Sequence, residues 1–260
     1  MKRITTAVAT ALLVLGAAGS AHAAPDPSLA KQLRSDLRAG ALGADVTLSV
    51  VEAATGEVLF DHDAAEPQLP ASTMKVITAT TSLASLGARH RFETSVVLGP
   101  SPKQIVLVGG GDPMLTSSDL RQLAQRTAKR LPTMGVDGTV EVGFDDYLFP
   151  RPTNAKGWAP GDMPAYAAAV RPLAMLGDYS TSPSDNAASV FLQALAAQGV
   201  SVRDVGRTSA AFDAPVVART GNTLARAIRL MFSVSENNIA EVLFRQVALA
   251  NGFQEIGRAH

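Results

Sequence analysis

The strongest constraint on the fold is a β-hairpin near the start of the chain. Residues 44–64 alternate apolar and polar side chains on both sides of Ala54–Glu57, where Gly56 suits a turn. Two strands alone bury too little surface to stand as a stable sheet. We therefore expect a larger antiparallel sheet, whose C-terminal strands are missing from the 260 residues.

The other periodicities surround this hairpin. Helical patterns cover residues 28–40 and begin again at Ser72; a mixed strand-and-helix segment follows, and two amphipathic helices start at Thr223. A domain interrupted by an insertion produces this order. We predict an α+β fold, with one domain formed by residues 24–99 and 214–254, interrupted by an inserted mixed α/β domain, residues 100–213.

Segments at both ends of the chain are not expected to belong to the folded domains. Lys2 and Arg3 precede an alanine-rich apolar run and a small-x-small site at 21–23, which is typical of a secretory signal peptide over residues 1–23. The run is too short for a stable membrane span. We expect an exported protein, either periplasmic or in the extracellular space and cell wall. Residues 255–260 match a translated sequencing adapter, which predicts a natural protein that continues.

Composition excludes several classes of function. The 23 basic and 23 acidic residues balance, which gives no reason to expect a nucleic-acid partner. There is no cysteine, and the four histidines are scattered, so we expect neither thiol chemistry nor a metal, and no cofactor. Gly109–Gly111 lacks a following Gly-Lys-Ser/Thr and indicates a turn. Adjacent Asp145 and Asp146 point apart and are interpreted as turn residues.

Ser72 and Lys75 stand three positions apart at the predicted start of a helix. Residues at this spacing share a helix face, so the serine hydroxyl and the lysine amine can meet. The positive end of the helix dipole favours a neutral lysine and an anion forming at the serine. A neutral, desolvated lysine can take the serine proton. The alternative is an ordinary helix cap followed by a solvated lysine.

In serine enzymes of the β-lactamase and penicillin-binding type, the S-x-x-K motif is accompanied by a second motif, Ser-Asp-Asn. Residues 184–186 read Ser-Asp-Asn, but Pro183 precedes them and an apolar helix follows, which favours a helix start. Residues 235–237 read Ser-Glu-Asn and lie between two amphipathic helices, where a short loop can aim polar side chains at one point. We favour the second triplet.

Four blocks carry a family resemblance: "PASTMKVITATTSLASLG", "VGGGDPMLTSSDL", "GWAPGDM" and "SENNIAEVLFRQVA". In this order they resemble the D-alanyl-D-alanine carboxypeptidase/endopeptidase family of low-molecular-mass penicillin-binding proteins, with a β-lactamase/transpeptidase-like domain. The resemblance implies that Ser72 is the acylated nucleophile and Lys75 its general base. It further implies that Ser235 relays protons to the leaving amine and that Asn237 holds the substrate amide.

The resemblance also suggests substrate-binding residues, in the loop that carries Trp158, Asp162 and Tyr166. A similar loop in relatives receives the free amino end of the peptide, and an aromatic wall with a carboxylate suits an ammonium group. The alternative is that Trp158 packs the loop onto the body of the protein.

The resemblance implies peptidoglycan stem peptides as substrates and β-lactam antibiotics as covalent inhibitors. One departure is the lack of a Lys-Thr-Gly strand, which supplies an oxyanion-hole donor in the family; losing one such donor costs roughly 10²–10³ in rate. We expect this chain alone to be inactive. The alternatives are a β-lactamase on the same fold and a non-catalytic wall-binding protein.

Overall fold

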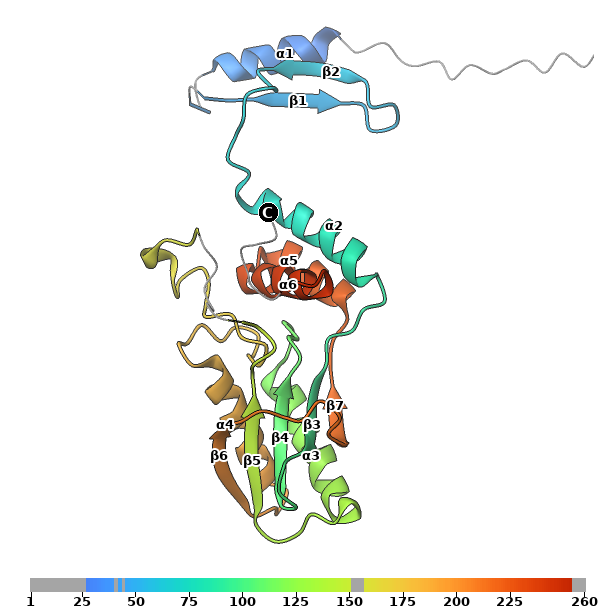
Figure 1. The fold of residues 1–260 in the computed structure, drawn as a ribbon. Helices are drawn as coiled ribbons and strands as arrows, with labels where there is room; N and C mark the ends of the chain where they lie inside the picture. Colours follow the sequence, from blue (N-terminus) through green and yellow to red (C-terminus); the bar gives the residue numbers. More distant parts are fainter. Residues whose placement is uncertain (1–26, 40–41, 44, 151–156, 254–260) are drawn as a thin grey trace, which may run out of the picture. The chain divides into compact units, whose positions relative to one another are not determined.

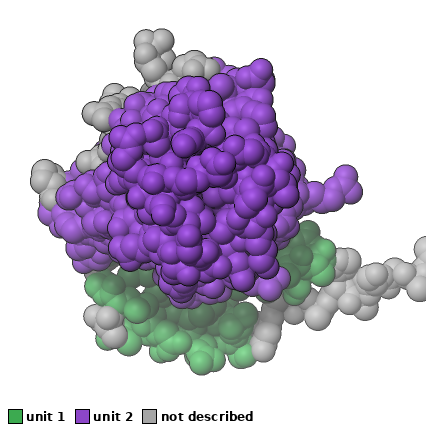
Figure 2. Space-filling model, turned by 90° about the horizontal axis from the view of Figure 1, so that it is seen from below, with its two compact units in different colours: residues 1–69 green, residues 70–260 purple. Residues whose placement is uncertain are grey.

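The computed structural model describes residues 27–39, 42–43, 45–150 and 157–253. The predicted signal peptide and the adapter-like residues 255–260 lie outside this part of the chain. Within it, no helix has both the length and the apolar character needed to cross a membrane. The chain divides into two units, residues 1–69 and 70–260, which Figure 2 shows in green and purple.

The first unit contains the predicted helix and hairpin. Helix α1 is Pro27–Arg38, and strands β1 (Leu48–Val51) and β2 (Val58–His62) pair antiparallel. Gly56 adopts a φ of 75° in the connecting turn, a left-handed conformation that glycine adopts without steric cost. Phe60 on β2 is buried. The hairpin prediction is confirmed.

The second unit is built on a five-stranded mixed sheet (Figure 1), in the order β6-β5-β4-β3-β7. Its strands are β3 (Thr94–Leu98), β4 (Gln104–Gly109), β5 (Val140–Asp145), β6 (Val202–Arg207) and β7 (Val216–Thr220). β4, β5 and β6 are parallel, whereas β3 pairs antiparallel with both β4 and β7. The central strand β4 is almost wholly buried, as its apolar run predicts.

Two crossover helices connect the parallel strands. α3 (Ser117–Arg130) joins β4 to β5, and α4 (Pro183–Ala196) joins β5 to β6. The helices contact each other, and their apolar sides share one core with the sheet. α3 begins with a capping box, in which Thr116 and Asp119 each satisfy the other's backbone N–H. The core is completed by fully buried leucine, isoleucine and phenylalanine side chains.

This sheet extends beyond the predicted bounds of the inserted domain. β3 precedes residue 100 and β7 follows residue 213, yet Thr94 on β3 pairs with Thr220 on β7. The predicted bounds therefore cut through a single sheet. The division of the chain into an interrupted and an inserted domain stays a prediction.

Three helices form a second core. One of them precedes β3 in the chain, and the other two follow β7. They are α2 (Met74–Leu86), α5 (Leu224–Val234) and α6 (Asn237–Ala250). Each of them contacts the other two. Apolar side chains from all three helices pack together with Phe92 and Met114. This core fixes the start of α2 opposite the junction between α5 and α6.

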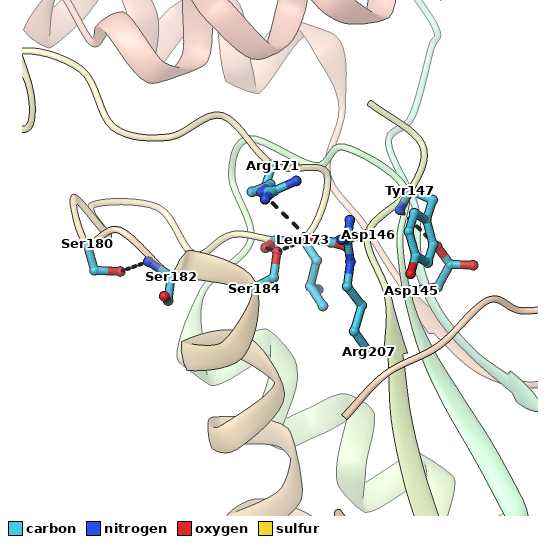
Figure 3. Close-up of polar contacts among 9 residues, drawn as sticks. All are labelled: Asp145, Asp146, Tyr147, Arg171, Leu173, Ser180, Ser182, Ser184 and Arg207. Atoms are coloured by element: carbon cyan, nitrogen blue, oxygen red, sulfur yellow. Dashed lines mark hydrogen bonds and ion pairs between the residues drawn. The ribbon is translucent and has the colours of Figure 1, made fainter. Parts of the chain in front are cut away.

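Asp146 lies at the centre of a buried polar cluster at the end of β5 (Figure 3). Its side chain accepts hydrogen bonds from Ser184 Oγ (2.8 Å) and from Arg207 Nε, and Arg171 Nε lies 3.7 Å away. Asp146 is 2% exposed. The interpretation as a turn residue was therefore wrong for Asp146. Asp145 is the last residue of β5, and its side chain accepts from the Tyr147 N–H.

Candidate active site

Ser72 lies in a single 3₁₀ turn, Ala71–Thr73, that leads directly into α2. Lys75 follows in the first turn of α2, and its Nζ lies 3.2 Å from Ser72 Oγ. The two side chains lie on one side of the helix start, because residues three apart share a helix face. Ser72 is exposed, whereas Lys75 is buried.

Ser235 joins this pair from the short connection between α5 and α6. Its Oγ lies 2.8 Å from Ser72 Oγ and 3.3 Å from Lys75 Nζ. Ser235 ends α5 in the left-handed region, with a φ of 56°. That conformation turns the chain sharply, so that α6 begins only two residues later and the hydroxyl points at α2.

Asn237, the first residue of α6, completes the polar cluster. Its Oδ1 accepts a hydrogen bond of 2.6 Å from Lys75 Nζ, and its Nδ2 donates to the Tyr166 carbonyl at 2.9 Å. The structure thus brings together the four residues that the sequence singled out as catalytic, from two separate segments of the chain, the start of α2 and the junction between α5 and α6. Their roles in a reaction stay predictions.

The electrostatic setting of Lys75 favours the neutral amine. Its side chain is 6% exposed, and this burial lowers the pKa of Lys75 from its usual 10.5, although the negative charge of Glu236 opposes the shift. The Glu236 carboxylate is occupied elsewhere. It accepts from Tyr179 Oη at 2.9 Å and from the Asn238 N–H at 3.0 Å. Burial and this carboxylate raise the pKa of Tyr179 to about 12.

Backbone strain is present on both sides of the cluster. In the part of unit 70–260 that the structure describes, the non-glycine residues with positive φ are Ala71 (45°) and Ser235 (56°). The left-handed region costs an ordinary residue about 1–2 kcal/mol. Such strain persists where the surrounding structure holds the residue in place, which is common at functional sites. Here it immediately precedes Ser72 and falls on Ser235 itself.

A cavity of about 560 Å³ opens beside this cluster. Its size suits part of a peptide or a drug-sized molecule. Its lining combines five polar or charged side chains near α2 and α6 with an apolar and aromatic wall. The lining residues are Ala71, Ser72, Met74, Lys75, Thr78, Trp158, Tyr166, Asn237, Ala240, Glu241 and Phe244.

Of the three residues predicted to bind substrate, Trp158 and Tyr166 line this cavity. Asp162 is not among the lining residues, and its carboxylate accepts from the Ala159 N–H at 2.8 Å. The carboxylate that does line the cavity belongs to Glu241 on α6. Its Oε1 accepts a hydrogen bond of 2.9 Å from Trp158 Nε1. Sequence reasoning missed Glu241, although it stands one helical turn after Asn237 and shares its face.

The other Ser-acid-Asn triplet lies in the Asp146 cluster, away from the cavity. Ser184 is 4% exposed, and its hydroxyl donates to Asp146 and to the Leu173 carbonyl. Asn186 Nδ2 donates to Asp178 and to Ser180 Oγ. The triplet occupies the first turn of α4, in agreement with its interpretation as a helix start. Within the described residues, no cluster of three or more metal-ligating side chains is found.

The sequence matches one family model over residues 29–178 and 176–256, that of the D-Ala-D-Ala carboxypeptidase 3 (S13) family. A D-alanyl-D-alanine carboxypeptidase of Actinomadura sp. (strain R39) is 35% identical over 186 residues, which cover 66% of this chain and 34% of the relative. Carboxypeptidase DacB of Mycolicibacterium smegmatis is 30% identical over 264 residues, covering 88% of this chain and 54% of the relative. The chain thus spans about a third to a half of these relatives.

The fold has a counterpart among solved structures. Penicillin binding protein 4 (dacB) from Haemophilus influenzae superposes with a TM-score of 0.67 at 16% sequence identity. The match covers 84% of this chain and 65% of that protein. At this identity the likeness concerns the fold, which agrees with the predicted α+β class.

Proposed function

Because the chain belongs to the D-Ala-D-Ala carboxypeptidase 3 (S13) family, we propose that it carries the nucleophile and base of a serine-type D-Ala-D-Ala carboxypeptidase/endopeptidase. The enzyme hydrolyses peptidoglycan stem peptides through an acyl-enzyme on Ser72. The observation that carries this proposal is the buried amine of Lys75, which contacts both Ser72 Oγ and Ser235 Oγ. A lysine with a lowered pKa next to a serine hydroxyl is the arrangement of an activated nucleophile.

The hydrogen bonds of the cluster are consistent with a neutral Lys75. A neutral amine has two N–H donors and one lone pair. The two donors satisfy Asn237 Oδ1 and Ser235 Oγ, and the lone pair accepts the Ser72 proton. The Ser235 hydroxyl then donates to Ser72 Oγ, at 2.8 Å. Every polar atom in this ring has a partner, and the Ser72 proton faces its acceptor.

Acylation follows from this arrangement. Ser72 Oγ attacks the carbonyl carbon of the scissile amide while its proton passes to Lys75 Nζ. The C–N bond of the tetrahedral intermediate then breaks. The proton returns from Lys75 through Ser235 Oγ to the leaving amine, which departs as D-alanine or as the amine of a cross-link. General acid–base transfer of this kind contributes about 10²–10⁴ in rate.

Deacylation uses the same groups in the reverse sense. Lys75, neutral again, takes a proton from a water molecule that attacks the ester carbonyl, and Ser72 leaves with that proton. Asn237 donates from its amide to the substrate backbone. A β-lactam acylates the same serine, because its strained amide presents a carbonyl to Ser72 as the peptide does.

The cavity wall supplies the binding surface for the peptide. Trp158 and Tyr166 pack against the stem peptide, and Asp162 lies between them in the same loop. The leader-like residues 1–23 support a location outside the cytoplasm, in the periplasm or in the extracellular space and cell wall, where peptidoglycan lies.

The test uses the product of the complete gene, because the chain spans only part of its relatives' length. Release of D-alanine from a stem pentapeptide is measured for the natural protein, for Ser72→Ala and for Ser184→Ala as a matched control. We expect release by the natural protein and the control, and none by Ser72→Ala. Equal release by all three proteins contradicts the proposal. Fast, continuous hydrolysis of benzylpenicillin without D-alanine release identifies a β-lactamase instead.

A further inference from the structure

Glu241 is the only carboxylate among the described residues that line the Ser72 cavity. It follows Asn237 by one turn of α6, so the same helix that presents Asn237 to Lys75 presents Glu241 to the aromatic wall. Its side chain is 16% exposed. A charge in such a position needs a partner, because the cost of removing it from water is several kcal/mol.

That partner is Arg245, a further turn along α6. Arg245 Nη1 donates to Glu241 Oε2 at 2.7 Å and to the Glu241 carbonyl at 3.1 Å. The arginine side chain is fully buried. Burying a guanidinium is costly unless an anion lies beside it, so the contact between Arg245 and Glu241 holds the carboxylate in one place. The pair is charge-neutral and sits beneath the cavity wall.

The second oxygen of Glu241 holds Trp158. Indole has a single donor, Nε1–H, and it donates to Glu241 Oε1 at 2.9 Å. With that edge fixed, the rest of the ring lines the cavity. Two further bonds attach the same loop to α6, from Asn237 Nδ2 to the Tyr166 carbonyl and from the Ala168 N–H to Asn238 Oδ1.

We propose that Glu241, held by Arg245, is a positioning residue that fixes Trp158 as a wall of the Ser72 cavity. It acts on substrate affinity and leaves the chemical step unchanged, because Trp158 is not part of the hydrogen-bonded ring around Ser72. The kinetic half of this inference rests on the proposed function, whereas the structural half does not. A hydrogen bond to a charged group shifts the equilibrium between a fixed and a mobile Trp158 side chain by about tenfold or more.

A pair of double variants isolates the hydrogen bond from the buried charge. Glu241→Ala with Arg245→Met removes both charges and the acceptor for Trp158. Glu241→Gln with Arg245→Met removes the same charges but keeps an acceptor, so it is expected to rescue the position of the indole. Neither variant leaves a buried arginine unpaired, which protects the fold. Glu141→Gln, in an exposed ion pair with Arg203, is the distant control.

Trp158 is the single tryptophan of the 260-residue chain, so intrinsic fluorescence of this chain reports on it directly. We expect the alanine double variant to show red-shifted emission and acrylamide quenching several-fold above that of the natural chain. The glutamine double variant and Glu141→Gln should match the natural chain. Unchanged emission and quenching in the alanine double variant overturns the inference, as does equal loosening in both double variants.

Kinetics of the complete gene product tests the consequence. The alanine double variant should raise KM for a stem peptide about tenfold with kcat within about twofold, and the glutamine double variant should remain near the natural values. A fall in kcat at unchanged KM contradicts a positioning role. If the natural protein fails to turn over the peptide, the proposed function fails, and the fluorescence result still decides whether Glu241 holds Trp158.

Discussion

Two Ser-acid-Asn triplets of this chain have nearly the same composition and opposite surroundings. Ser235 is exposed, lies in a strained conformation and touches Ser72 and Lys75 beside an open cavity. Ser184 is buried in regular helix, and its hydroxyl is fully used by Asp146 and the Leu173 carbonyl. Both hydroxyls are hydrogen-bonded, but only that of Ser235 adjoins an amine with a lowered pKa.

The difference shows what makes a polar cluster reactive. In the Asp146 cluster, opposite charges face each other, and their attraction offsets the cost of burying them. In the Ser72 cluster, no carboxylate among the described residues hydrogen-bonds to Lys75, and burial favours the neutral base. We propose that the first arrangement serves stability and the second serves chemistry. The predictions below separate these two roles.

The largest expected effects come from removing the hydroxyl of Ser72 or of Ser184. The first change should lower the acylation rate, and the second should mainly lower the free energy of unfolding. We expect Ser72→Ala to lower the acylation rate of the complete gene product roughly 10⁴-fold or more, because the nucleophile is lost. Ser184→Ala should acylate within a few-fold of the natural rate and lower the free energy of unfolding by about 1.5–3 kcal/mol. Attachment of a labelled penicillin and urea unfolding measure the two effects. Comparable loss of acylation in both variants would contradict the separation of a catalytic Ser72 from a structural Ser184.

Removing the Asp146 carboxylate should lower the free energy of unfolding and leave the acylation of Ser72 unaffected. Asp146→Ala leaves Arg171 and Arg207 without their counter-ion in a largely buried cluster, which costs about 3–5 kcal/mol. The matched control is Glu141→Gln in the exposed pair with Arg203, for which we expect about 0–1 kcal/mol. Urea unfolding of the 260-residue chain checks both. A loss below about 1 kcal/mol for Asp146→Ala would mean that this cluster is not structural.

The lowered pKa of Lys75 predicts a pH dependence of stability. Between the folded pKa and 10.5, the unfolded chain binds a proton that the folded chain does not, so the free energy of unfolding rises with pH in this window. Below the folded pKa, both states are protonated and the folded state bears the cost of a buried cation. Each unit of pKa lowering corresponds to about 1.4 kcal/mol.

Lys75→Met removes this titration. We expect the variant to be at least as stable as the natural chain at pH 7 and to lack the part of the rise between pH 7 and 10 that Lys75 causes. Lys103→Met, at an exposed lysine, serves as the control and should keep that rise. Urea unfolding at several pH values is the measurement. An identical pH profile for Lys75→Met and the natural chain is the opposing result.

The smallest effect concerns the strain at Ser235. Glycine adopts a φ of 56° without the steric cost that serine bears, so Ser235→Gly should unfold with up to about 1 kcal/mol more free energy than Ser235→Ala. Both variants lose the hydroxyl and should acylate equally slowly. Calorimetric melting distinguishes them. A glycine variant less stable than the alanine variant would show that the conformation is unstrained.

Local signals predicted much of this structure. Alternation around Gly56 indicated the hairpin, and the three-residue spacing of Ser72 and Lys75 indicated their contact. The position of residues 235–237 between two amphipathic helices separated them from the buried triplet at 184–186. Each of these features depends on residues close together in the chain.

Contacts between residues far apart in the chain were not predicted, because the sequence signals used are local. Glu241 gains its place in the site through Trp158, 83 residues earlier, and nothing local marks that contact. Asp146 is buried by side chains from positions 171, 184 and 207, so its neighbours in sequence gave a misleading picture. The sheet crosses the predicted domain bounds because Thr94 pairs with Thr220, a partner that periodicity does not identify.

The most direct test of the account is the site of covalent attachment by benzylpenicillin. The complete gene product is incubated with the antibiotic, digested and analysed by mass spectrometry. We predict one adduct, on the hydroxyl of Ser72, with none on Ser184 or Ser235. The absence of any adduct, or an adduct on either of the other two serines, would contradict the assignment of Ser72 as the nucleophile.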